Sequence, residues 1–229
     1  NIGLILGIAS ILSPLSYPFA RLKGDLFFLL GITALPIFSI KFNFMNFYAG
    51  ITYIGILLIY CYYLINSDYE LEEMEYSNRK NIITFSLLGF LGLGFGSHFF
   101  VEGAVGLAEF FGISSIVIGM TIVAIGTSFP DLATTLVAIR KGESSLAIGN
   151  IIGSNIMNIV AVLGVSFMIK EISSTSISIN NQLTVMALLT CLLFIMLFLN
   201  NRLSRSIGVI FLMIYSLFIF LNFDSLWIS

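Results

Sequence analysis

The composition of the chain excludes a soluble globular protein. Of its 229 residues, 58% are hydrophobic and 10% are charged, and the mean hydropathy is +1.04, whereas soluble domains have about 25% charged residues. The net charge of −2 leaves no basic surface for nucleic acid. Both cysteines lie in apolar runs, which argues against a disulfide framework. These features predict an all-α polytopic membrane protein.

Apolar runs of membrane-spanning length follow one another along the chain. A spanning helix needs about 20 apolar residues at ~1.5 Å per residue. A partial segment over 1–12 is followed by seven full predicted spans, at 25–40, 46–65, 82–111, 115–139, 146–169, 182–199 and 206–223. All connections are short. The acidic connection 66–81 is interpreted as a solvated linker, with a weak regulatory cation site as the alternative.

Basic residues gather in alternate connections. If successive spans run in opposite directions, one side of the membrane carries eight of the ten basic residues, namely Arg21, Lys23, Arg79, Lys80, Arg140, Lys141, Arg202 and Arg205. The other side carries Lys41 and Lys170. By the positive-inside rule, the first side and the linker 66–81 face the cytoplasm, and the C-terminus faces outside.

Two parts of the chain resemble each other at a constant offset. Asn, Ile, Leu and Gly recur between 1–10 and 158–167 at an offset of 157, and an offset of 158 pairs Gly50 with Gly208. Corresponding helices are five crossings apart, so the second copy runs in the opposite direction. Inverted repeats are typical of secondary transporters. The pattern predicts an incomplete first half over 1–65, a second half over 82–229, and a missing N-terminal segment of the same protein.

A proline interrupts the predicted hairpin 115–169. Pro130 cannot donate a hydrogen bond to the Gly126 carbonyl or fit against it, so we expect the helix to kink or break there and to free backbone oxygens. Asp131 follows directly. A carboxylate inside the hydrocarbon layer is a functional candidate by default because its burial is costly.

The polar residues of this hairpin are arranged symmetrically about its loop. The loop is centred between residues 142 and 143, so Asp131 mirrors Ser154, and Thr127 mirrors Asn158. Each helix carries its two polar residues four positions apart, which places them on one helix face. Together they offer carboxylate, amide, hydroxyl and carbonyl oxygens. This all-oxygen set suits a hard cation such as Ca²⁺ or Na⁺.

Other polar or small residues have a simpler interpretation. The Gly-xxx-Gly patterns that begin at Gly92 and Gly149 are typical of close helix packing. Glu102 and Glu109 are expected near the outer interface, and His98 is interpreted as a packing or interfacial residue.

With these motifs the chain resembles the cation/Ca²⁺ exchanger superfamily, in particular the prokaryotic sodium/calcium exchangers. The resemblance covers the whole chain and rests on Gly126–Asp131 (GTSFPD) and Gly149–Asn155 (GNIIGSN), which are similar to the second of the family's two α-repeats. It implies two inverted five-helix halves with both termini outside, in a prokaryotic inner membrane. On that pattern the first two helices and half of the third are absent from this chain.

The resemblance also implies an ion site around Asp131, at the position of the family's central acid. The further ligands would be carbonyls of Thr127 and Ala124, hydroxyls of Ser128 and Ser154, and the polar side chains of Asn158 and Asn1, its partner across a pseudo-twofold axis. The family usually has Glu at the position of Asp131, and some members have Asp at that of Asn158. Asp131 is shorter than Glu, and Asn158 lacks the charge of Asp. The sequence therefore does not say which cation the site prefers.

The sequence therefore predicts a secondary antiporter that exchanges Ca²⁺ for Na⁺ by alternating access, with no enzymatic activity and no cofactor. The expected partners are the two ions and the lipid bilayer. Ca²⁺/H⁺ exchange is the alternative within transport. An intramembrane protease that uses Ser128 or Ser154 with His98, or an aspartyl pair, is a remote alternative. The first lacks a Gly-x-Ser-x-Gly elbow, and the second lacks another deep aspartate.

Overall fold

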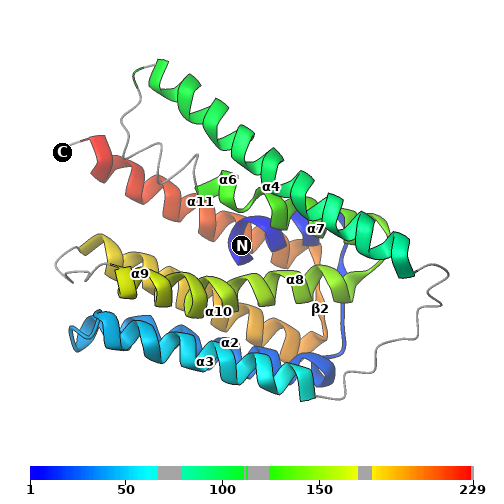
Figure 1. The fold of residues 1–229 in the computed structure, drawn as a ribbon, viewed down its shortest axis with the longest axis horizontal. Helices are drawn as coiled ribbons and strands as arrows, with labels where there is room; N and C mark the ends of the chain where they lie inside the picture. The colour runs from blue at the N-terminus through cyan, green and yellow to red at the C-terminus, as the bar shows by residue number, and fades with distance from the viewer. Residues whose placement is uncertain (67–78, 111, 113–123, 170–176, 228–229) are drawn as a thin grey trace.

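A computed structural model describes residues 1–66, 79–110, 112, 124–169 and 177–227 of the chain (Figure 1). Most of the predicted linker 66–81 and the first part of the connection after residue 169 lie outside the described residues. In chain order the elements are η1 (Ile2–Leu6), α1 (Gly7–Leu12), β1 (Leu15–Ser16), α2 (Phe19–Lys41), α3 (Phe47–Asn66), α4 (Arg79–Phe110), α6 (Ala124–Thr127), α7 (Phe129–Arg140), α8 (Ser144–Met157), η3 (Asn158–Val162), α9 (Leu163–Ile169), α10 (Ile177–Asn200), β2 (Arg202–Leu203) and α11 (Arg205–Trp227).

The predicted spans correspond to helices in the described part of the chain. Five helical stretches there are long and apolar enough to cross a bilayer: Phe19–Lys41, Phe47–Asn66, Thr84–Phe110, Ser144–Ile169 and Asn181–Asn200. The remaining predicted spans, 115–139 and 206–223, coincide in part with α6–α7 and with α11. The chain is thus a helical integral membrane protein.

Local sequence signals explain where several helices begin. Pro18 precedes α2 with a φ of −61°, so α2 begins at Phe19, six residues before the predicted boundary. Arg21 and Lys23 therefore lie on the first turns of α2 and not in a loop, which corrects the expected connection. Asn46 precedes α3, and its side-chain oxygen accepts hydrogen bonds from the backbone N–H groups of Tyr48 and Ala49, both at 3.1 Å.

A short β-ribbon joins two connections that are distant in sequence. β1 pairs with β2 in antiparallel fashion, with Leu15 opposite Leu203 and Ser16 opposite Arg202. The backbone N–H of Phe19 also donates to Asn201 Oδ1 at 2.6 Å. The connections after α1 and before α11 therefore lie at the same end of the molecule, as the alternation of spans predicts. The last residues of α3 and of α11 lie at opposite ends of the molecule (Figure 1).

The core contains two close helix contacts that involve glycine. α1 packs on α11, and α3 packs on α9. A Cβ atom at Gly208 would lie 2.7 Å from the Gly7 carbonyl oxygen, and one at Gly50 would lie 2.6 Å from the Gly164 carbonyl oxygen. These distances leave no room for a side chain.

The two glycine contacts are related by the sequence offset. Gly7 and Gly164 are 157 residues apart, and Gly50 and Gly208 are 158 apart. Each half of the chain thus contributes one glycine to each contact. The π-helical turns η1 and η3, which the sequence analysis did not foresee, also occupy corresponding positions.

The Gly-xxx-Gly patterns at Gly92 and Gly149 were expected to mark close packing, and this is wrong for the described residues. A Cβ atom at Gly92, Gly96, Gly149 or Gly153 would meet no described atom within 4 Å. The spacing of glycines along a helix does not say which face another helix covers.

The contact of α3 with α9 is testable by a pair of matched substitutions. Gly50→Ala forces the Gly164 backbone away and is expected to cost about 1–3 kcal/mol. Gly55→Ala, on the same helix, meets nothing within 4 Å, so better helix propensity leaves stability equal or up to ~1 kcal/mol higher. Thermal unfolding of the two purified variants in detergent measures the difference. Equal melting temperatures would contradict the contact.

Candidate functional site

The hairpin helix is interrupted next to the predicted carboxylate. α6 ends at Thr127, Ser128 forms a turn, and α7 begins at Phe129. Pro130 lies in the first turn of α7, where its missing N–H leaves no hydrogen bond unmade within that helix. The predicted break is confirmed. Thr127 ends α6 and Asp131 lies in α7, and the shared helix face expected for this pair stays a prediction.

Asp131 lies in the first turn of α7 and is half-buried. The N-terminus of a helix favours a negative charge because its backbone N–H groups point outward along the axis. α7 contacts η1, the element that directly follows Asn1. Two elements that are far apart in the sequence are therefore brought together, and the N-terminus lies near the middle of the molecule (Figure 1).

The side chain of Asn1 carries an unsatisfied polar atom. Its Nδ2 is buried and has no hydrogen-bond partner among the described residues. A buried amide without a partner is costly in an apolar protein interior. A hydrogen-bond acceptor at this position would satisfy the Nδ2 donor and lower the free energy.

Asn150 joins the two helices of the hairpin. Its Nδ2 donates two hydrogen bonds, one to Thr135 Oγ1 at 3.2 Å and one to the backbone oxygen of Asp131 at 3.3 Å. Residues 135 and 150 mirror each other about the loop centre, so the predicted hairpin register is confirmed at this pair. The sequence analysis missed Asn150 as a positioning residue, although the same mirror rule would have found it.

The other predicted ligands lie on the elements that surround this pair. Ser154 is half-buried on α8, one turn beyond Asn150. Asn158 is the first residue of η3, and Ala124 is the first residue of α6. Ser128 precedes α7 and makes no capping hydrogen bond through its side chain. The ligand roles of these residues, and the pairing of Thr127 with Asn158, stay predictions.

The charge of the arrangement comes from a single acid. Among the described residues there is no group of three or more His, Cys, Asp and Glu side chains that could hold a metal ion. His98, considered as a protease base, lies 3.7 Å from Glu102 on the exposed face of α4. What Asp131 and its neighbours can supply is therefore one carboxylate together with neutral oxygens.

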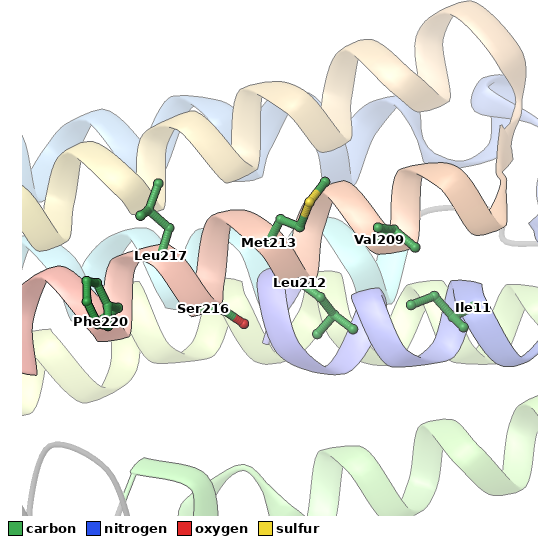
Figure 2. A pocket seen from close by; sticks show the side chains of 7 residues that line it. All are labelled: Ile11, Val209, Leu212, Met213, Ser216, Leu217 and Phe220. Atoms are coloured by element: carbon green, nitrogen blue, oxygen red, sulfur yellow. The ribbon is translucent and has the colours of Figure 1, made fainter.

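Two cavities lie elsewhere in the bundle. A groove of about 650 Å³ between α1 and α11 is lined by Ile11, Val209, Leu212, Met213, Ser216, Leu217 and Phe220 (Figure 2). Its described lining is apolar apart from Ser216. A second cavity of about 300 Å³ between α2, α3 and α8 contains Asp25, which accepts a hydrogen bond from the Tyr60 hydroxyl at 2.9 Å.

A bundle of apolar helices in which one helix is interrupted directly before an acid is typical of membrane transport proteins of the broken-helix kind. Comparison with known proteins agrees with this class. Residues 81–223 match the family model described as sodium/calcium exchanger protein. The chain belongs to that family, whose members are exchangers and not enzymes.

Relatives match over much of the chain. Sodium/calcium exchanger MaX1 of Methanosarcina acetivorans is 37% identical over 152 residues, which are 66% of this chain and 43% of that protein. An uncharacterized membrane protein of Methanocaldococcus jannaschii is 32% identical over 94% of this chain and 70% of its own length. A structure of the sodium-calcium exchanger NCX_Mj soaked with Na⁺ and Sr²⁺ has a TM-score of 0.77 and 29% identity, covering 95% of this chain and 71% of that one.

Proposed function

We propose that the chain is the larger part of an antiporter that exchanges Ca²⁺ for Na⁺ by alternating access. The observation that carries this proposal is the carboxylate of Asp131, placed directly after the break between α6 and α7, in a helix that contacts η1. Hard cations bind carboxylate, carbonyl, hydroxyl and amide oxygens. The proposed ligands are Asp131, Thr127, Ser128, Ser154, Asn158, Ala124 and Asn1.

Exchange would follow from competition of the two ions for one set of oxygens. An empty site leaves a charged carboxylate in the apolar layer, which opposes movement of the site across the membrane. Bound Ca²⁺ or Na⁺ offsets that charge, and the occupied site then changes sides. Each ion is transported only when the other has left, so the gradient of Na⁺ can drive Ca²⁺ outward.

The proposed architecture is two inverted halves. The contacts of Gly7 with Gly208 and of Gly50 with Gly164 support it, because the sequence offset interchanges the two contacts. The matching positions of η1 and η3 support it as well. In such a fold the two π-helical turns would face each other at mid-membrane, where bulged backbone is frequent at functional sites.

A complete divalent-ion site would need a second carboxylate. Asp131 is the only acid among the proposed ligands, and neutral oxygens leave much of the desolvation cost of Ca²⁺ unmet. We propose that a segment outside residues 1–229 supplies it. Asp131 is one methylene shorter than glutamate, so its reach limits how tightly the two acids can enclose the ion.

The orientation of the chain is proposed from its basic residues. The β-ribbon end, which carries the connections 13–18 and 201–204, is placed in the cytoplasm, and the connection around Phe44 is placed outside. In a variant without Cys61 and Cys191, an impermeant maleimide applied to intact cells is expected to label Phe44→Cys and to spare Lys141→Cys. The opposite labelling pattern would reverse the orientation.

Asp131 is tested in the full-length protein that contains this chain, reconstituted in vesicles. Asp131→Asn keeps the size and removes the charge, so Na⁺-driven Ca²⁺ uptake is expected to fall to background. Asp131→Glu is expected to retain or raise Ca²⁺ affinity because it reaches further. Glu143→Gln, an exposed acid in the loop of the same hairpin, is the control and should exchange normally.

Two outcomes of this assay would change the proposal. Normal Ca²⁺ exchange by Asp131→Asn would remove Asp131 from the ion site. Uptake by the unaltered protein that follows an imposed pH gradient, with no dependence on Na⁺, would replace Na⁺ by H⁺ as the counter-ion.

A further inference from the structure

Ser97 is less exposed than its neighbours on helix α4. Between Thr84 and Phe100, every residue of α4 is exposed except Ser97, which is half-buried. The exposed positions include large apolar side chains, such as Phe90 at 75% exposure. The least exposed residue of α4 along this stretch is thus a small polar one.

The surroundings of Ser97 form a compact contact with the broken helix. The Ser97 hydroxyl donates to the backbone carbonyl of Gly126 at 3.2 Å. One turn further along α4, the ring of Phe100 stacks on Phe129 with 5.1 Å between ring centroids. A Cβ atom at Gly126 would collide with Val101. α4 therefore meets α6 and α7 on both sides of the interruption at Ser128, as Figure 1 shows for the helices.

The carbonyl that Ser97 binds is the one affected by Pro130. In a continuous helix the N–H of residue 130 would donate to the carbonyl of residue 126, and proline has no N–H. A backbone carbonyl without a donor is costly inside a membrane protein. The Ser97 hydroxyl supplies a donor from another helix, and serine more often bonds within its own helix.

The Gly126 carbonyl is joined to the predicted ligand Thr127 through one peptide plane. Glycine has wide freedom in φ and ψ, so without a partner this plane would rotate easily. The Thr127 carbonyl belongs to the next peptide plane, so a change in ψ of Gly126 that is not compensated at Thr127 would turn this carbonyl away from the position of the ion.

We propose that Ser97 is a positioning residue for ion exchange: its hydroxyl holds the Gly126 peptide so that the carbonyls of α6 face the ion beside Asp131. This inference rests on the proposed function. The hydrogen bond from Ser97 to Gly126 is then a polar link between α4 and the site, beside the stacking of Phe100 on Phe129. If α4 moves relative to α6 during transport, the bond is broken and remade in each cycle.

The bond predicts separate effects on affinity and on rate. Ser97→Ala is expected to raise the KM for Ca²⁺ about 3- to 10-fold, the size of one net hydrogen bond. The maximal rate should stay equal or rise, because a restraint on α4 is removed. Ser97→Thr keeps the hydroxyl and should restore the KM. Ser86→Ala, an exposed serine on the same helix, should change neither quantity.

The experiment measures Na⁺-driven Ca²⁺ uptake by the full-length protein and these three variants in vesicles. Amide hydrogen exchange of the peptide that spans residues 124–132 is measured on the same proteins without ions. The expected result is a raised KM together with faster exchange in Ser97→Ala, and neither in Ser97→Thr or Ser86→Ala.

Each other outcome contradicts a definite part of the account. An unchanged KM in Ser97→Ala overturns the positioning role, and so does an equal loss of rate in the Ala and Thr variants. If the unaltered protein transports no Ca²⁺, the proposed function fails. In that case faster hydrogen exchange confined to Ser97→Ala still supports the link between α4 and α6, and unchanged exchange rejects it.

Discussion

A single missing hydrogen-bond donor governs the organisation of this protein around its centre. Pro130 cannot supply the N–H that the Gly126 carbonyl would receive in a continuous helix. The chain responds by ending α6 at Thr127 and restarting as α7 at Phe129. That restart gives Asp131 a helix N-terminus, where a carboxylate is favoured. Asn150 then ties the backbone oxygen of Asp131 to α8. The break thus places the Asp131 carboxylate where the helix N-terminus favours its negative charge.

The remainder of the bundle holds this interruption between close contacts. Glycines allow α1 to approach α11 and α3 to approach α9 closely, and buried aliphatic side chains such as Ile151, Ile152 and Ile156 fill the space around α8. In contrast, α4 is exposed along most of its length and meets α6 and α7 near the break. Within the described residues α4 is thus a peripheral helix whose main contacts are with α6 and α7.

Much of the fold could be predicted from the sequence because the bilayer imposes strong rules. Apolar run length predicted the helices, and alternation placed the β1 and β2 connections at one end. The mirror rule about the loop 142–143 also gave the correct hairpin register, which the bond between Asn150 and Thr135 displays. These features depend on neighbouring residues or on simple geometry.

The features that were missed depend on tertiary contacts. Gly149 and Gly50 are both glycines in apolar helices, and only packing distinguishes the open position from the crowded one. The π-helical turns shift the register without a marked sequence signal. The hydrogen bond from Ser97 to Gly126 joins residues 29 positions apart, across segments that the sequence does not place side by side.

The central claim is that the ion binds at the break between α6 and α7. A crystal structure of the full-length protein soaked with Sr²⁺, with anomalous diffraction to locate the ion, tests this most directly. The account predicts an anomalous peak about 2.3–2.6 Å from an Asp131 carboxylate oxygen, the distance range of Ca²⁺ ligands, with carbonyls of α6 also in contact. A peak elsewhere, with Asp131 free of the ion, would contradict it.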